Sequence, residues 1–147
     1  MASFKGTYDY TVDSKGRVNI PARFRRALPA GDKKTFVVTR GADGCIDVWP
    51  QHEWASREEK LKSLSGNQKD NRLMVRLLLQ DASESQFDSQ GRISIPPPLL
   101  NMAKIGKDVK ILGALDHIEL WNPDMYDSYL RDNVESYETV IERIALH

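Results

Sequence analysis

The feature that most constrains the fold of this chain is an internal duplication. Residues 13–21 read DSKGRVNIP and residues 88–96 read DSQGRISIP, so six of nine positions are identical at an offset of 75. A second match follows at an offset of 72, with GADGCIDVWP at 41–50 and GALDHIELWN at 113–122. Two matches in the same order indicate a duplicated unit of about 50 residues, too long and with too few copies for a solenoid. We therefore expect a pseudo-two-fold arrangement within one chain.

Both copies show the same order of short elements. In the first copy, composition and alternation predict strands at 7–12, 17–20, 34–39 and 45–49, with a short helix from Pro21 to about residue 28. The second copy predicts strands at 85–87, 92–95, 109–112 and 117–121, with a helix near 98–103. Turns at 13–16 and 88–91 combine an Asp that bonds its own backbone with a Gly, and we expect each turn to close a hairpin.

Longer helices follow each copy. Residues 50–64 begin with Pro and end before Gly66, and residues 70–80 are apolar on nearly every side, which predicts a helix sandwiched between the two units. From Pro123 onward, apolar residues recur at helical spacing and predict one long amphipathic helix. Its stripe is interpreted as intramolecular core, with a docking face for another subunit as the alternative. The stripe consists of Tyr126, Tyr129, Leu130, Val134, Tyr137, Val140, Ile141 and Ile144.

The composition excludes several classes of protein. The chain of 147 residues is 40% hydrophobic and 29% charged, which is typical of a globular protein. No apolar run approaches the length of a membrane span, and no apolar segment at the N-terminus suggests secretion, so we expect a cytoplasmic protein. The single cysteine, Cys45, excludes an internal disulfide or a cysteine-cluster metal site and is interpreted as a small apolar filler.

The sequence contains no recognisable catalytic signature. It lacks the phosphate-loop, dinucleotide-binding, zinc-protease and nucleophile-elbow motifs, so we expect no enzyme activity, no cofactor and no metal. The histidines His52, His117 and His147 are scattered, and His117 aligns with Cys45 in the duplication, which suggests a packing position. A hydrolase with an unrecognised site is the weakest of the alternatives.

A net charge of zero hides an asymmetry between the two halves. Residues 1–80 carry 15 Lys and Arg against 9 Asp and Glu, whereas residues 81–147 carry 6 against 12. A basic half suits a polyanion such as nucleic acid. Attraction between the halves of neighbouring subunits, or chance clustering on a solvated surface, would leave the same pattern.

The basic residues of the first copy are candidates for DNA contact. Lys15 and Arg17 lie on the first turn, and Arg23, Arg25 and Arg26 follow on the predicted helix, where Arg23 and Arg26 share a face. A turn with a flanking basic helix is a plausible reader of a groove or of phosphates, because Arg offers a planar fork.

The second copy provides an internal comparison, because there only Arg92 keeps its charge. The shared residues, Asp13 with Gly16 and Asp88 with Gly91, are therefore candidates for shaping the turns. By the same comparison, Arg17 and Arg92 could pair with these aspartates rather than contact DNA.

Several segments together resemble the MraZ family of transcription regulators over about residues 4–145. These segments are DSKGRVNIPARFRRAL, DSQGRISIP, IDVWP, IELWN and RLLLQDASE. The resemblance implies an α+β chain of two AbrB-like (SpoVT-AbrB) swapped-hairpin units. On this basis we expect unit 1 at 7–54, basic and facing DNA, connecting helices at 55–82, unit 2 at 83–126 and a C-terminal helix at 127–147.

The resemblance also implies a function. Family members bind double-stranded DNA at promoter repeats upstream of their own gene, at the head of the division and cell-wall gene cluster, and they assemble into rings at the nucleoid. The DNA-contacting motif of the family corresponds to Asp13 through Arg17, with a second copy at Asp88 through Arg92. The second copy departs from the pattern, because it is poor in basic residues and continues into Pro96, Pro97 and Pro98. The alternative function is an oligomeric scaffold for a protein partner, with only non-specific affinity for DNA.

Overall fold

Strands from the two copies alternate within one antiparallel sheet. The computed structural model describes residues 3–29, 35–133 and 135–144, and the sheet has the order β1-β7-β8-β4-β3-β5. A second sheet consists of β2 and β6 alone. The strands are β1 (Thr7–Thr11), β2 (Arg17–Asn19), β3 (Thr35–Arg40), β4 (Ile46–Pro50), β5 (Ser83–Gln86), β6 (Arg92–Ser94), β7 (Asp108–Gly113) and β8 (Ile118–Trp121). Lys34, at the start of an expected strand, lies outside the described residues.

Strand pairing shows that the two copies are swapped into each other. The outer strand β1 pairs with β7 of the second copy, and the outer strand β5 pairs with β3 of the first. At the centre, β4 pairs with β8, so that Asp47 lies opposite Glu119, its equivalent in the duplication. This arrangement confirms the predicted α+β fold with duplicated, swapped units and an internal pseudo-two-fold relation.

The expectation of a hairpin within each copy requires correction. The first turn closes with a hydrogen bond of 2.9 Å from Asp13 N to Arg17 O, but beyond it only an isolated Val12–Val18 bridge joins the two arms. Instead, β2 pairs with β6 of the other copy, and Val18 lies opposite Ile93. Both side chains are buried, and a two-stranded hairpin by itself would be marginally stable in water.

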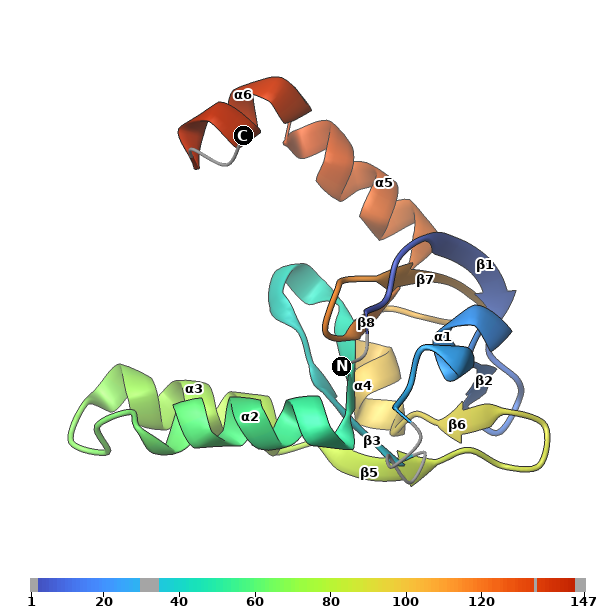
Figure 1. Cartoon of the computed structure of the whole chain (residues 1–147), viewed down its shortest axis with the longest axis horizontal. Helices are drawn as coiled ribbons and strands as arrows, with labels where there is room; N and C mark the ends of the chain where they lie inside the picture. The colour runs from blue at the N-terminus through green and yellow to red at the C-terminus, as the bar shows by residue number, and fades with distance from the viewer. Residues whose placement is uncertain (1–2, 30–34, 134, 145–147) are drawn as a thin grey trace.

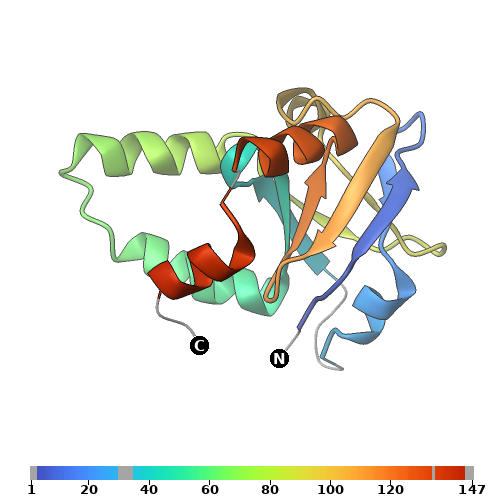
Figure 2. The same cartoon turned by 90° about the horizontal axis from the view of Figure 1, so that it is seen from above.

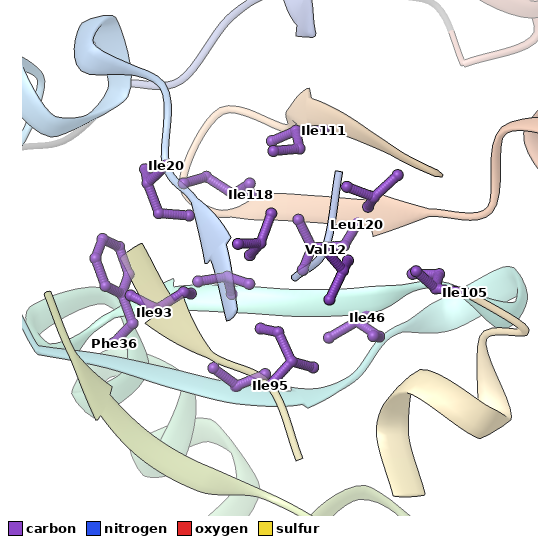
Figure 3. Close-up of a cluster of buried hydrophobic side chains, with 14 of the residues drawn as sticks. Val12, Ile20, Phe36, Ile46, Ile93, Ile95, Ile105, Ile111, Ile118 and Leu120 are labelled. Carbon is purple, nitrogen blue, oxygen red and sulfur yellow. The ribbon is translucent and has the colours of Figure 1, made fainter. Parts of the chain in front are cut away.

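The swapped strands enclose one hydrophobic core that both copies build. Val12, Ile20 and Ile46 of the first copy meet Ile93, Ile118 and their neighbours of the second (Figure 3). The short helices α1 (Ala22–Arg26) and α4 (Pro97–Met102) each contribute one buried side chain, Phe24 and Leu99. Cys45 is completely buried, but its interpretation as an apolar filler requires correction, because its Sγ lies 3.1 Å from Ala42 O and 3.8 Å from Asp47 Oδ1 and the residue is outside both hydrophobic clusters. The fold therefore does not divide into two independent cores.

Helices α2 (Gln51–Lys62) and α3 (Lys69–Leu79) extend from the sheet as an antiparallel pair (Figures 1 and 2). The base of the pair is fixed by Trp54, which packs with Val37 and Trp49 in a second buried cluster. The expectation that residues 70–80 are sandwiched between the units is wrong, because α3 has no buried residue and exposes Leu73, Met74 and Leu77. The many apolar residues of α3 therefore form a face that remains exposed to solvent within the described chain.

The C-terminal segment forms two helices rather than the single long helix that its periodicity predicts. Helix α5 (Pro123–Asp132) is capped by the side chain of Asn122 and ends at Asn133 in a non-helical conformation. Ser136 then caps α6 (Tyr137–Arg143), which makes a new start.

The core interpretation of the C-terminal stripe is correct only near Trp121. The ring of Trp121 packs against Tyr126 and Tyr129, whereas Leu130, Val140 and Ile144 are exposed. Val134 lies outside the described residues. Within the described part of the chain, no helix combines the length and the apolarity needed to cross a membrane.

Candidate nucleic-acid interface

The paired strands β2 and β6 form a short two-stranded ribbon with one buried and one outer side. Val18 and Ile93 face the core, so the alternation of a strand places the residues on either side of them on the outer side. These residues are Arg17, Asn19, Arg92 and Ser94, and Asn19 and Ser94 are exposed. Asn19 and Ser94 were not among the residues predicted to contact DNA, although strand alternation and their equivalence in the duplication could have identified them.

In each turn, one aspartate holds the arginine that follows it. Oδ1 of Asp13 accepts hydrogen bonds of 2.9 Å from the backbone N–H groups of Lys15 and Arg17, and Oδ2 accepts one of 2.7 Å from Arg17 Nε. The same three bonds, with the same lengths, join Asp88 to Gln90 and Arg92. Each arginine is therefore held by its Nε–H in a defined orientation. Within the described residues, no protein acceptor pairs with the terminal nitrogens of Arg17.

The two turns are also linked to each other. Arg92 Nη1 lies 3.5 Å from Asp13 Oδ2, so Asp13 faces the arginines of both copies. The hydrogen bond from the backbone N–H of Arg17 is the main cause that lowers the pKa of Asp13, and the equivalent bond from Arg92 lowers the pKa of Asp88 to about 2. Both aspartates are therefore ionised at neutral pH, and they hold the arginines as charged partners.

Gly16 and Gly91 allow each turn to dock against the opposite copy. Their φ angles are +78° and +77°, a region that side chains rarely adopt. Gly16 O accepts a hydrogen bond of 2.9 Å from Ile95 N, and Gly91 O accepts one of 3.1 Å from Ile20 N. A Cβ at Gly16 would lie 3.2 Å from Ile95 O, whereas a Cβ at Gly91 would meet the guanidinium of Arg25.

The basic helix α1 flanks the second turn, not the first turn that precedes it in sequence. Arg25 lies over Gly91 and donates a hydrogen bond of 2.9 Å from Nη1 to Ile20 O. Arg25 and Arg26 line a hollow of about 560 Å³ together with residues 88–91. The exchange of strands is the physical reason, because it moves each turn beside the helix of the other copy. The first turn adjoins α4, which has no basic residue, through Leu100.

As a result, α1, β2 and β6, which carry cations of both copies, lie together at one end of the molecule (Figure 1). Arg23 and Arg26 are exposed on α1, Arg25 is half-buried, and Lys15 is exposed on the first turn. Arg17 and Arg92 contact the two turn aspartates, and Arg25 and Arg26 line the hollow that includes Asp88. The helix pairs α2–α3 and α5–α6 extend toward the other end.

A second charged cluster lies at the centre of the large sheet, where the duplication places Asp47 opposite Glu119. His117 Nε2 lies 3.5 Å from Asp47 Oδ1 and 3.4 Å from Glu119 Oε2, and its ring stacks on Trp49 with the ring centroids 4.3 Å apart. The sequence shows no obvious pair of carboxylates. The alignment of IDVW with IELW contained the signal, but only the pairing of β4 with β8 brings the two carboxylates together.

The pKa values of Asp47 and His117 are both raised, for different reasons. Burial raises the pKa of Asp47 to about 6. Burial by itself lowers the pKa of His117, but hydrogen bonds to Glu119 and Asp116 outweigh it and raise the pKa to about 9. At neutral pH, His117 is therefore a cation between two facing carboxylates, and it offsets one of their two negative charges. Ligand atoms of Cys45, Asp47 and Glu119 lie within 4.8 Å of one another, but burial raises the pKa of the Cys45 thiol and keeps it protonated.

This cluster predicts a pH-dependent stability. Because the folded-state pKa of His117 is raised, its stabilisation is complete below the unfolded value near 6.5 and is lost as the pH rises through about 9. We expect His117→Gln to be less stable than the unchanged chain by roughly 3 kcal/mol at pH 6.5, from the size of the shift. Urea unfolding of both proteins should show this gap narrowing by pH 9.5, and a gap independent of pH would contradict the prediction.

Comparison with known proteins gives one consistent result. The profile of the MraZ family, described as "MraZ protein, putative antitoxin-like", matches residues 3–77 and again residues 78–147. A protein of Halothermothrix orenii named Transcriptional regulator MraZ is 47% identical over 137 residues, which cover 93% of each chain. Relatives of the same name from Desulforamulus reducens and Pediococcus pentosaceus are 42% and 39% identical, and each alignment covers 96% of both chains.

Proposed function

The chain belongs to the MraZ family of transcriptional regulators, and from this premise we propose that it binds promoter DNA through the β2–β6 ribbon. One observation supports the proposal above all: two arginines, Arg17 and Arg92, are each held by an aspartate on the outer side of a single ribbon. Binding then uses both copies, rather than the basic turn of the first unit alone.

The dimensions of DNA suit a ribbon of this kind. The major groove of B-DNA admits a two-stranded β-ribbon, and side chains on its outer side reach the edges of the bases. An arginine held by its Nε–H keeps terminal N–H groups for O6 and N7 of guanine, and Asn pairs well with adenine. Arg17 fits this description most fully, since Nη1 of Arg92 also lies 3.5 Å from Asp13 Oδ2. Arg17, Arg92 and Asn19 are therefore the proposed reading residues, with Ser94 as a smaller contact.

The surrounding cations would fix the ribbon on the DNA backbone. Lys15, Arg23 and Arg26 are exposed beside the ribbon and suit phosphate contacts, which position a protein without reading sequence. Arg25 has a mixed role in this proposal, because one of its terminal nitrogens is engaged by Ile20 O. Asp13, Asp88, Gly16 and Gly91 shape the turns.

Repetition of the ribbon would supply the affinity that one ribbon lacks. We propose that subunits assemble into a ring at the nucleoid and engage promoter repeats upstream of their own gene, in the division and cell-wall cluster, as the family resemblance implies. Linked binding sites raise the effective concentration for each further contact, so affinity should rise steeply with the number of repeats.

A fluorescence-anisotropy titration tests the proposal. DNA from upstream of the protein's own gene is compared with a shuffled duplex, and we expect a preference of at least ~1000-fold at physiological salt. The logarithm of the affinity should fall by about 0.9 per phosphate contact for each tenfold rise in salt. Equal and weak binding to both duplexes would contradict it and would favour the alternative of a protein scaffold, which the exposed apolar faces of α3 and α6 suit.

A further inference from the structure

The outer side of the β2–β6 ribbon has two nearly equivalent ends. At one end Arg17 lies opposite Ser94, and at the other end Asn19 lies opposite Arg92. The duplication relates Arg17 to Arg92 and Asn19 to Ser94. A ribbon with perfect two-fold symmetry would fit a DNA site equally well in two opposite orientations. Whether this chain distinguishes the two orientations therefore depends on how its two ends differ.

The terminal nitrogens of the two arginines are not equally available. Arg92 Nη1 lies 3.5 Å from Asp13 Oδ2, so Arg92 faces the aspartates of both turns. Among the described residues, Arg17 is paired with Asp13 alone, through Nε at 2.7 Å. The side chain of Arg17 is also more exposed, at 31% against 22% for Arg92. We therefore expect Arg17 to read guanine more strictly than Arg92 does.

The neutral residues of the two ends differ in chemistry and in surroundings. Asn19 presents an amide that can pair with adenine through two hydrogen bonds, whereas the hydroxyl of Ser94 bonds several bases without such preference. Asn19 also borders a hollow of about 810 Å³, which Asp9 and Asp108 line together with Arg25. Because the two carboxylates repel phosphates, the amide is better placed for a base edge than for the DNA backbone. Ser94 instead lies beside β5, where its backbone N–H donates a hydrogen bond of 3.0 Å to a serine hydroxyl.

Cations do not separate the two ends in the same way. Arg25 and Arg26 lie beside the second turn. Lys15 lies on the first turn, and the backbone carbonyl of Lys107 accepts a hydrogen bond from Val12 just before that turn. Cations at both ends attract DNA phosphates in either orientation, and phosphate contacts carry no sequence information. The choice of orientation is therefore left to the residues that read bases.

We propose that the chain lies on its DNA site in a single orientation, set by Arg17 at one end of the ribbon and by Asn19 at the other. In this orientation, Arg17 faces a guanine and Asn19 faces an adenine. In the reverse orientation, Arg92 would meet that guanine and Ser94 would meet that adenine. The loss of one bidentate contact to a base disfavours the reverse orientation by about 5- to 150-fold. This inference rests on the proposed binding of DNA by the ribbon, and it adds which way the ribbon lies.

Directed cleavage of DNA measures the orientation. An iron–EDTA reagent is attached to Ala22→Cys or to Pro97→Cys, at equivalent, exposed positions where α1 and α4 begin. Neither residue is a proposed DNA contact, and the unchanged chain, whose single cysteine is buried, is the unlabelled control. On DNA from upstream of the protein's own gene, each label should cut at least ~5-fold more on one side of each binding site. The two labels should cut on opposite sides.

The outcomes separate this inference from the binding of DNA itself. Equal cutting on both sides of each site, by both labels and on DNA that the protein protects, would overturn the single orientation and leave the DNA proposal standing. DNA that is neither protected nor cut would overturn both.

Variants of the labelled chain test the two orienting residues. Asn19→Ser places the same residue at both equivalent positions of the ribbon, so the ratio of cutting on the two sides should move toward one. Arg17→Ala should move the ratio in the same direction. Gln86→Ser, which removes an exposed amide on β5 outside the ribbon, is the matched control and should keep the ratio. A ratio that neither Asn19→Ser nor Arg17→Ala changes would overturn the assignment of these residues.

Discussion

Cutting the chain into residues 1–80 and 81–147 is expected to leave neither half folded as a monomer. The cut removes β7 from β1, β3 from β5 and β6 from β2, and it divides the single core between two molecules. Because only pairing of two units restores these ladders, folding of each half should depend on concentration, and an equimolar mixture should recover the spectrum of the whole chain. Circular dichroism and sedimentation on dilution measure this dependence.

The variant Ile93→Asp sharpens this test of the shared core. Ile93 is buried opposite Val18, so a charge there should abolish recombination of the halves, because a buried unpaired charge is very costly. Ser94→Asp, on the exposed side of the same strand, is the matched control and should recombine. A half that unfolds cooperatively as a dilute monomer would show that each copy has its own core, against the strand pairing seen here.

Replacing Arg17 by Ala is expected to weaken binding to promoter DNA by about 5- to 150-fold, the range of one lost bidentate contact to a base. Binding to a shuffled duplex should fall much less, so that the preference for the promoter decreases. The melting temperature should change by only a few degrees, because the ion pair to Asp13 is partly exposed. Titration of both duplexes, together with a thermal melt, separates lost recognition from lost stability.

Two further variants make the interpretation of Arg17→Ala specific. Lys15→Ala removes a side chain that has no role in the turn, since only its backbone N–H bonds Asp13. This variant should weaken binding to the promoter and to the shuffled duplex by the same factor. The dependence of the affinity on salt should fall by the equivalent of about one phosphate contact. Arg17→Lys keeps the positive charge but loses the planar guanidinium, so its affinity for the promoter should be reduced about as much as that of Arg17→Ala. Unchanged promoter affinity in a folded, assembled Arg17→Ala protein would remove Arg17 from the interface.

The turns of the candidate interface were predictable residue by residue, but the arrangement of the elements around them was not. The spacing of aspartate, glycine and arginine in DSKGR and DSQGR was enough to anticipate the ion pairs of both turns. The position of Arg25 over Gly91 was not, because α1 follows the first turn in sequence and only the strand exchange carries it to the second. For the same reason Asn19 and Ser94 became candidates only when β2 was found beside β6.

The apolar segments show what helical periodicity can predict and what it cannot. The pattern of residues 70–80 predicts a helix with large apolar faces, and α3 has them. Whether such a face meets the same chain or another one is not encoded in its spacing, and α3 and α6 both leave theirs open. Likewise, the break between α5 and α6 comes from capping by Ser136, a local competitor to the longer helix.

The sequence by itself determined the duplication, the type and order of nearly every element, the chemistry of the turns and the family. These follow from local rules: alternation, helical spacing, turn residues and repeated motifs. The tertiary structure decided which copy each strand pairs with, which helix flanks which turn, and that Asp47 would face Glu119 across the centre of the sheet. These are long-range choices, set by which pairing buries Val18, Ile93 and their neighbours in one core, and local patterns do not specify them.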